Sequence, residues 1–493
     1  MVQGAARQTL QLAGLACLAS IAGMTGALPG LAATPAWEDR RDRDMAAINE
    51  FRHIAALSRL EAATNLPSPQ HRYVTLVIGG DLGFGGSRQP VVATAGVRHG
   101  RRHSFAKLTR HLRPLIQSDL AFANLESVVT ATNKLSALDK TFTFRMHPNG
   151  VAHLVEAGFN VLSTANNHGI DYGSGGMRHT IRHLASLRHS GLIAAHGIAP
   201  SAAAVFAPTR FTRNGATFAF AAAGIGGYRA KRSSPGQASY RSTADFDRLT
   251  QALARADTAY RMLSVHYGAE LQVRPDRRSR NKLAATAVGE RGIDLVIGHH
   301  AHTPAGVQRV GHGLVFYGLG NLLHLGMQDM GKFGICRDFG LLAKLHLVSD
   351  RRTGGRLVAQ AIELTALRDM HVNSRPRTGR DGRQRIEVIN YLGRELNDAT
   401  GKRVTFVPRR DGSGLYCAPG AEKAGGAVRR LCSGWRAPSK PSAALQRRIR
   451  HSCRYRRKRS ATAKLVKLRG RIVPRSKKRR RAAFKRSVYR HRD

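Results

Sequence analysis

Residues 292–302 read Gly292-Ile293-Asp294-Leu295-Val296-Ile297-Gly298-His299-His300-Ala301-His302. The apolar run is short enough for a buried strand, and three histidines follow it within four residues. Imidazole is a common neutral ligand for Zn, Fe, Mn and Ni, and a His-x-His pair at the end of a strand lets two rings converge on one cation or on two neighbouring ones. A histidine-rich surface turn is the alternative interpretation, so the rest of the chain has to be considered.

The same arrangement, a short apolar stretch ending in polar residues, recurs along the chain. Such stretches cover residues 73–78, 120–123, 159–165, 259–265 and 313–317. Helical patterns at residues 174–190 and 278–291 lie between some of them. Strands that alternate with helices and end in polar residues predict an α/β fold with a site at the strand ends.

The polar residues at these ends combine carboxylate, amide and imidazole groups. They are Asp81, Glu126, Asn167, His168, His266, His300 and His302. This mixture suits Mn, Fe or Zn better than Ca or Mg, which prefer oxygen ligands alone. One or two such ions would polarise a phosphate ester and activate a water molecule, and an uncommitted histidine could protonate the leaving oxygen.

Six motifs, in their order along the chain, resemble the signature of the CapA-type poly-gamma-glutamate synthesis proteins. They are Gly80-Asp81, Asn124-Leu125-Glu126, Asn166-Asn167-His168 with Asp171, His266-Tyr267-Gly268-Ala269-Glu270, Gly298-His299-His300-Ala301-His302 and Gly318-Leu319-Gly320-Asn321. The resemblance extends from about residue 74 to residue 364. That family is similar to the calcineurin-like metallophosphoesterases. The resemblance therefore implies an α/β fold in the form of a four-layer α/β/β/α sandwich with metals at the edge loops of its two sheets.

The resemblance also implies roles for individual residues. The implied metal ligands are Asp81, Glu126, Asn167, His266, His300 and His302, with Glu126 in the bridging position. The implied catalytic acid is His168. Six further residues are expected to contact the metal ligands or His168 without binding the metal themselves. They are Asn124, Asn166, Asp171, Glu270, His299 and Asn321.

Two departures from the phosphoesterase pattern leave open whether one metal or two would bind. The Asp-x-His motif is reduced to Asp81-Leu82-Gly83, so one imidazole ligand is missing. In addition, a glutamate at position 126 reaches further than the aspartate usual there.

Charge divides the chain into parts. Its 80 Lys and Arg residues exceed its 31 Asp and Glu residues, for a formal net charge of +49. About 22 of those basic residues lie in residues 447–493, a low-complexity stretch. We therefore predict a folded domain over residues 72–410, a linker over 411–445 and a disordered basic arm over 446–493.

The first 71 residues predict export. Arg7 precedes an apolar stretch from Leu10 to Leu28, so residues 1–33 are expected to be a cleaved signal peptide or a retained membrane anchor. Residues 34–71 carry a helical apolar stripe and are expected to form a stalk. We therefore expect a protein of the periplasm or cell envelope. In such an oxidising compartment Cys417 and Cys432 could form a disulfide.

Two functions of different classes fit these observations. The first is an exported metallophosphoesterase-like hydrolase that acts in the synthesis, export or anchoring of an anionic surface polymer, poly-gamma-glutamate by resemblance. The second is a non-enzymatic protein of the cell envelope that binds polyanions, in which the metal site is degenerate. Contacts with a membrane surface or with other capsule proteins are further possibilities for the basic arm. The export signal argues against nucleic acid as its natural partner, and a solvated tail without a partner is the remaining interpretation.

Overall fold

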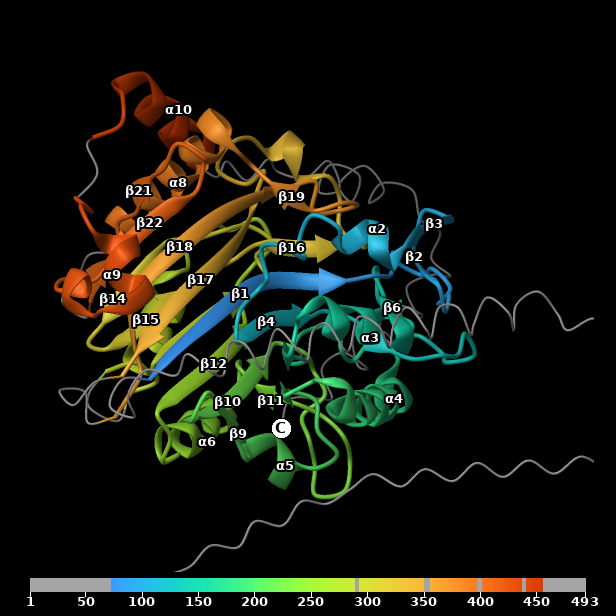
Figure 1. Ribbon diagram of the computed structural model, residues 1–493. Coiled ribbons are helices and arrows are strands. Elements are labelled where there is room, and N and C mark those ends of the chain that lie inside the picture. Colours follow the sequence, from blue (N-terminus) through green and yellow to red (C-terminus); the bar gives the residue numbers. More distant parts are fainter. Residues whose placement is uncertain (1–71, 289–291, 350–354, 397–400, 437–439, 455–493) are drawn as a thin grey trace, which may run out of the picture. The chain divides into compact units, whose positions relative to one another are not determined.

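Figure 1 shows the computed structural model of the chain, in which residues 72–288, 292–349, 355–396, 401–436 and 440–454 are described. Two large mixed sheets organise these residues. The expected signal or anchor (1–33) and stalk (34–71) lie outside the described residues, as does the basic arm from residue 455 onward.

The first sheet is built around strand β1. Its strands in order are β21 (Val407–Pro408), β22 (Gly414–Cys417), β18 (Val358–Arg368), β17 (Gly340–Val348), β1 (Tyr73–Gly83), β4 (Leu120–Leu125), β7 (Val161–Ser163) and β8 (Ala194–His196), with β16 (Asn321–His324) beside β1 and β19 (Arg375–Pro376) beside β18. Strands β1, β4, β7 and β8 are parallel, and β16 is also parallel to β1. Figure 1 shows β18, β17, β1 and β4 lying side by side. Strands β17 and β18 form an antiparallel hairpin.

The second sheet has a parallel centre of its own. Its strands in order are β11 (Ala238–Ser239), β10 (Ala216–Gly224), β12 (Tyr260–His266), β13 (Leu295–His299), β15 (Gly313–Phe316), β14 (Val307–Val310) and β20 (Lys402–Arg403), with β9 (Thr209–Arg213) beside β10. Strands β10, β12, β13 and β15 are parallel. The carboxyl ends of these strands therefore lie on one edge of the sheet, as they do in the first sheet.

The two sheets stack face to face across the main hydrophobic core. Leu76 and Ile78 of β1 and Leu295 and Ile297 of β13 all belong to this core. The residues between them point the other way, because successive side chains of a strand alternate between its faces. Val77 accordingly packs in a second cluster on the outer face of the first sheet, and Val296 packs in a third on the outer face of the second sheet. Strands buried on both faces explain the unbroken apolar runs in the sequence.

Helices cover both outer faces. Helices α2 (Phe105–Thr109) and α3 (Pro148–Ala157) contribute to the outer cluster of the first sheet, and α6 (Thr243–Ala254) and α7 (Arg277–Ala285) contribute to that of the second. This layer order confirms the predicted α/β/β/α sandwich. The remaining α-helices described are α4 (Gly173–Ser186), α5 (Ala202–Phe206), α8 (Gly379–Arg394), α9 (Gly426–Cys432) and α10 (Ala443–Cys453). No helix among the described residues is long and apolar enough to span a membrane.

The fold continues beyond residue 410, where the sequence predicts a linker. Strand β22 pairs with β18 and extends the first sheet, and α9 packs beneath it in a small apolar cluster that includes Leu415 and Val428. Helix α10 also belongs to the folded part, since Ile449 and Cys453 are buried in the main core. The elements here are short, with four residues in β22, seven in α9 and eleven in α10, so their hydrophobic patterns are weak in the sequence.

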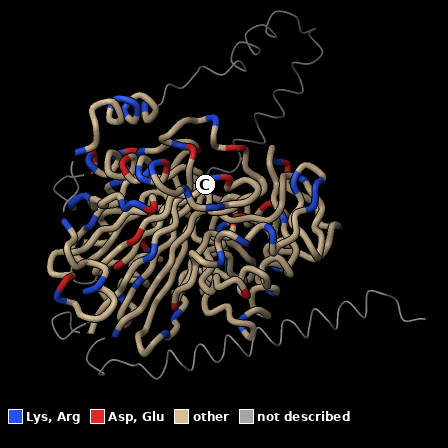
Figure 2. The backbone as a smooth tube through the Cα atoms, turned by 45° about the horizontal axis from the view of Figure 1, so that its top comes forward, with Lys and Arg blue, Asp and Glu red and all other residues tan. Residues whose placement is uncertain are grey.

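Basic charge is spread over the folded part as well. Figure 2 shows Lys and Arg along many separate segments of the described chain, with fewer Asp and Glu. Some of these arginines have structural roles. Arg385 on α8 forms ion pairs with Asp338 and Asp381, and Arg377 also pairs with both.

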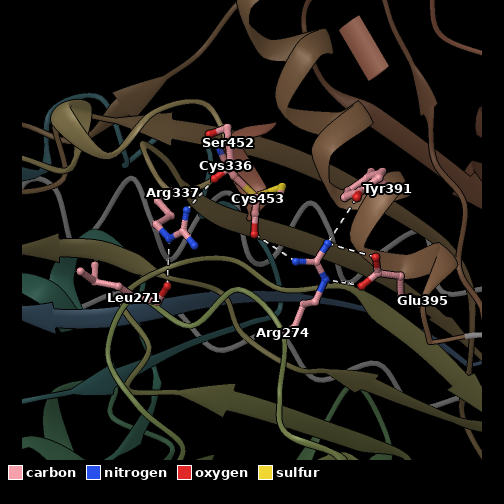
Figure 3. The surroundings of a disulfide bond; sticks show 8 residues. All are labelled: Leu271, Arg274, Cys336, Arg337, Tyr391, Glu395, Ser452 and Cys453. Carbon is pink, nitrogen blue, oxygen red and sulfur yellow. Dashed lines mark hydrogen bonds and ion pairs between the residues drawn. A yellow bond between two sulfur atoms is a disulfide. The ribbon is translucent and has the colours of Figure 1, made fainter. Parts of the chain in front are cut away.

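Two disulfides fix the carboxyl-terminal part of the described chain. The predicted bond between Cys417 and Cys432 is present and joins residues 15 positions apart. A second bond, not predicted from the sequence, joins Cys336 to Cys453 across 117 positions. Figure 3 shows this bond beside Arg274, which hydrogen-bonds to the backbone oxygen of Cys453 and pairs with Glu395. Helix α10 is therefore attached covalently to the loop before β17.

We expect the two disulfides to differ in their effect on stability. Replacing Cys336 and Cys453 by serine should lower the free energy of unfolding by about 4–5 kcal/mol, and replacing Cys417 and Cys432 should lower it by about 3 kcal/mol. The reason is that the entropy of loop closure grows with loop length. Equilibrium unfolding in guanidinium of the oxidised variants measures both values. A larger loss for the short loop would contradict this order.

Candidate metal centre

The candidate centre lies where the parallel strands of both sheets end. Asp81 is near the end of β1, and Glu126 directly follows β4. His266 is the last residue of β12, and His300 directly follows β13. Contacts between Asp81 and His299 and between Glu126 and His266 join the two sheets at this edge.

The first group of ligand atoms comes from Glu126, His266 and His300, and these atoms lie within 4.8 Å of one another. Glu126 Oε1 is 3.4 Å from His266 Nε2. The side-chain oxygen of Asn167 lies 2.6 Å from the same nitrogen, so the predicted amide ligand adjoins this group.

The second group comes from Asp81, Glu126 and His302, again with ligand atoms within 4.8 Å of one another. Asp81 Oδ2 is 3.1 Å from His302 Nδ1, and Glu126 Oε2 is 4.0 Å from that nitrogen. Glu126 belongs to both groups, one carboxylate oxygen facing each. This is the position that the sequence resemblance implies for it.

These residues fit a divalent cation. Two ligand atoms that each lie about 2.0–2.2 Å from the same ion are roughly 3.0–3.4 Å apart. Asp81 Oδ2 and His302 Nδ1 are 3.1 Å apart, and Glu126 Oε1 and His266 Nε2 are 3.4 Å apart, so both pairs have this spacing. Both carboxylate oxygens of Glu126 are buried and form no hydrogen bond with the described residues. A buried carboxylate in this state is costly unless a cation or a proton balances it. The nitrogen and oxygen donor set matches Mn, Fe or Zn.

The pKa shifts of the metal-free centre differ from one candidate ligand to the next. Burial, followed by the charge of Asp81, raises the pKa of Glu126 well above its usual value. Burial alone would raise the pKa of Asp81, but the neighbouring imidazoles of His299 and His302 hold it well below its usual value. Burial lowers the pKa of His266, and burial and the charge of His302 lower that of His300 to about 4. Neutral imidazoles are the form that binds metal, and His266 and His300 are in that form. Burial would lower the pKa of His302, but the charge of Glu126 and the contact with Asp81 raise it to about 9, so this ring would lose a proton on binding a metal.

The histidine turn after β13 has unusual backbone geometry. His300 has φ 88° and His302 has φ 55°, both in the left-handed region that residues other than glycine rarely adopt. Gly298 is also required, because a Cβ at that position would lie 2.5 Å from the backbone oxygen of Tyr317. Such strained positions occur where surrounding structure holds a functional site in place.

This turn is linked to the long-range disulfide. Arg337, next to Cys336, donates from Nε to the backbone oxygen of Leu271 at 2.9 Å and from Nη1 to that of Ser452 at 2.7 Å (Figure 3). The backbone nitrogen of Leu271 in turn donates to the oxygen of Ala301 at 2.8 Å. Ala301 lies between the two histidines, so a short series of contacts joins the disulfide to the ligand turn.

His168 lies beside the ligand groups and is paired with Asp171. Its Nδ1 is 2.7 Å from Asp171 Oδ2, and Asp171 also pairs with Lys140 and accepts a hydrogen bond from the backbone nitrogen of Phe144. Burial lowers the pKa of His168, and Asp171 partly opposes that shift. A carboxylate that holds Nδ1–H leaves Nε2 free to accept or donate a proton, as acid–base histidines require. Lys140 was not identified from the sequence.

The asparagines expected to support the ligands connect them by hydrogen bonds. Asn124 donates to Asp81 Oδ1 at 2.8 Å, and Asn166 donates to Asn124 Oδ1 at 3.2 Å. Asn166 also accepts from the backbone nitrogen of His168 at 3.0 Å, which fixes that turn. Asn321 Oδ1 lies 2.9 Å from His302 Nδ1.

Two predicted supporting residues differ in their placement. His299 is buried, with Nδ1 3.3 Å from Asp81 Oδ1. Glu270 is exposed and is not part of either ligand group, although its charge acts on both Glu126 and His302.

His324 at the end of β16 is a site residue that the sequence reasoning missed. Its Nε2 is 3.8 Å from Glu126 Oε2, and its ring packs against Phe144 with centroids 4.9 Å apart. Burial lowers its pKa to about 3, so the ring is neutral. The signal was present in the sequence, because His324 is a polar residue at the end of an apolar strand like the others.

The fold and this cluster define the class: an α/β/β/α sandwich with a buried histidine–carboxylate centre at the common edge of its parallel strands. Residues 75–324, about half of the chain, match the family described as "Bacterial capsule synthesis protein PGA_cap". The chain belongs to this family.

Curated relatives carry related names. The "Capsule biosynthesis protein CapA" of Bacillus anthracis is 26% identical over 54% of this chain and 64% of its own length. The "PGA biosynthesis protein CapA" of Bacillus subtilis is 26% identical over 43% of this chain and 56% of its own length. The chain thus spans less than two thirds of the length of these relatives. A solved phosphatase structure from Mycoplasma pneumoniae aligns over 60% of this chain and 93% of its own at 13% identity, with a TM-score of only 0.35.

Replacing His300 and His302 by alanine should abolish retention of a transition metal, because each ligand group loses one imidazole. Metal content of untagged full-length protein, purified without chelator, can be measured by plasma mass spectrometry. The matched control is the same double replacement at His179 and His183, a half-buried histidine pair on α4, outside both ligand groups. Unchanged metal content in the His300/His302 variant would show that the metal, if bound, is held elsewhere.

Proposed function

We propose that this protein is an exported, metal-dependent hydrolase of the metallophosphoesterase type that acts in the synthesis, export or anchoring of an anionic surface polymer of the poly-gamma-glutamate class. The observation that carries the proposal is the shared carboxylate of Glu126, buried between two groups of ligand atoms. Membership of the capsule synthesis family and the names of the relatives support the choice of polymer.

Export is supported by the cysteines as well as by the amino-terminal sequence. All four cysteines among the described residues are paired in disulfides, which persist in oxidising compartments such as the periplasm or cell surface. The apolar stretch from Leu10 to Leu28 would then act as a cleaved signal or as an anchor in the cell envelope.

Each residue at the centre has a separate role in the proposed chemistry. A divalent ion would be held by Asp81, Glu126, Asn167, His266, His300 and His302. When bound, it would supply positive charge that polarises the scissile bond and makes a nearby water more acidic. His168 would transfer the proton to the leaving oxygen at Nε2, since Asp171 holds its Nδ1–H. Lys140 would balance the charge of Asp171, so the carboxylate stays paired with a cation when His168 is neutral after giving up its proton.

Replacing His168 by alanine should lower turnover of an activated phosphomonoester or phosphodiester by roughly 100-fold or more while bound metal is retained, as expected when a general acid is lost. Hydrolysis or transfer of glutamyl bonds in the polymer should be measured in parallel. His153→Ala, a histidine on α3 that bonds to Thr109, serves as the control. Equal rates for the wild type and the His168 variant would contradict the assigned role.

The second candidate is a non-enzymatic protein that binds polyanions in the cell envelope. The formal charge of +49 favours it, because that excess is far larger than solubility requires. The dense basic residues from Tyr455 onward would supply most of the affinity for an acidic polymer or an anionic membrane surface. The absence of turnover with any divalent metal would favour this reading.

We expect a truncation after Arg454 to remove salt-sensitive binding of polyanions and to leave metal content unchanged. The cut is placed there because Ile449 and Cys453 are part of the core. With DNA as the probe, affinity of the full chain should fall about 1,000-fold or more between about 50 and 200 mM salt if six or more charges are neutralised. Poly-gamma-glutamate is tested in the same way. Full binding by the truncated protein would place the polymer site on the folded domain instead.

A further inference from the structure

The neighbourhood of His324 contains an unusual pair of buried polar groups. Its Nε2 is fully buried and meets no acceptor with standard hydrogen-bond geometry among the described residues, although the backbone oxygen of Glu126 acts as an acceptor that raises its pKa against the larger effect of burial. The carboxylate oxygens of Glu126, the nearest of which is 3.8 Å away, are likewise buried without a hydrogen-bond partner in that part of the chain. Two unsatisfied groups facing each other inside a protein are rare, because each carries a desolvation cost.

The other ring nitrogen of His324 determines which of the two carries the proton. The backbone nitrogen of Gly326 donates a hydrogen bond to Nδ1 at 3.1 Å. Nδ1 is therefore an acceptor, and a neutral imidazole has its single N–H on Nε2. The group that faces Glu126 is thus a donor, whereas direct metal ligation through Nε2 would need a free electron pair there.

The surroundings hold the ring in this orientation. Strand β16 runs parallel to β1 with His324 opposite Gly83. A Cβ at Gly83 would lie 3.1 Å from Nε2 and 3.4 Å from the backbone oxygen of Glu126, so the glycine leaves the space that the imidazole occupies. Phe144 packs edge-on against the ring, and the backbone nitrogen of His324 donates to the oxygen of Met370 at 2.7 Å. The donor is therefore aimed at Glu126 by two strands and an aromatic side chain.

We propose that His324 is a positioning residue of the metal centre, whose Nε2–H donates a hydrogen bond to the Glu126 carboxylate and fixes how that carboxylate is shared between the two ligand groups. At the 3.8 Å separation of this structure the hydrogen bond is not formed, so the proposal requires the Glu126 carboxylate to turn about its last side-chain bond. Carboxylates that bind metals are commonly oriented by such outer hydrogen bonds, and losing one typically costs about 10- to 100-fold in metal affinity. This inference rests on the proposed metal centre.

The test compares two replacements of His324 in the full-length protein. In His324→Phe a ring of similar shape remains without a donor, so affinity for Zn or Mn, measured by competition with a chelating dye, should fall about 10- to 100-fold. In His324→Gln the side-chain amide can reach the place of Nε2 and donate, so affinity should stay within a few-fold of the wild type. His346→Phe is the control, because His346 is also buried and its Nε2 lies 3.1 Å from a glutamate, Glu363, outside the centre.

Two results would overturn the proposal. Wild-type affinity in His324→Phe would show that the donor has no effect, and an equally severe loss in both variants would make His324 a direct ligand.

A second measurement does not depend on metal. NMR of metal-free protein with ¹⁵N-labelled histidine, assigned by comparison with His324→Gln, should give the Nε2–H tautomer for His324. The Nδ1–H tautomer would refute the inference, whereas an absence of metal binding by the wild type with the Nε2–H tautomer present would instead refute the proposed function.

Discussion

The carboxylate of Glu126 is the constraint on which the centre depends. It lies at the meeting edge of two stacked sheets, fully buried, and finds no hydrogen-bond donor among the described residues. Burying a charge in this way is unfavourable unless a cation or a proton compensates it. The neighbouring residues are arranged to allow that compensation, since His266 faces one oxygen and His302 and His324 face the other.

Much of this arrangement could be predicted from the sequence because parallel strands impose it. A strand buried on both faces reads as an apolar run, and the polar residues at its carboxyl end lie at the edge of the sheet. Asp81, Glu126, His266 and His300 each follow this rule, and the structure brings them together from four strands. The hairpin of β17 and β18 and the Cys417–Cys432 bond were predictable for a similar reason, because their partners are close in sequence.

The features that the sequence did not predict depend on contacts between distant segments. Pairing of Cys336 with Cys453 requires α10 to lie against the loop before β17, and no local pattern encodes that placement. Lys140 contacts Asp171 from a loop without periodicity. The end of the domain was placed too early because β22 is only four residues long and is recognisable only through its pairing with β18.

The disulfide between Cys336 and Cys453 has a consequence for the order of assembly. Every residue of the ligand groups precedes Cys336 in the chain. Arg337, which contacts Leu271 and through it Ala301, also donates to the backbone oxygen of Ser452, next to Cys453. During synthesis the strands that carry the ligand residues are complete before Ser452 and Cys453 are added. The bond can therefore close only after all the residues of the ligand groups have been made, and it ties the last described helix to the turn that carries His300 and His302.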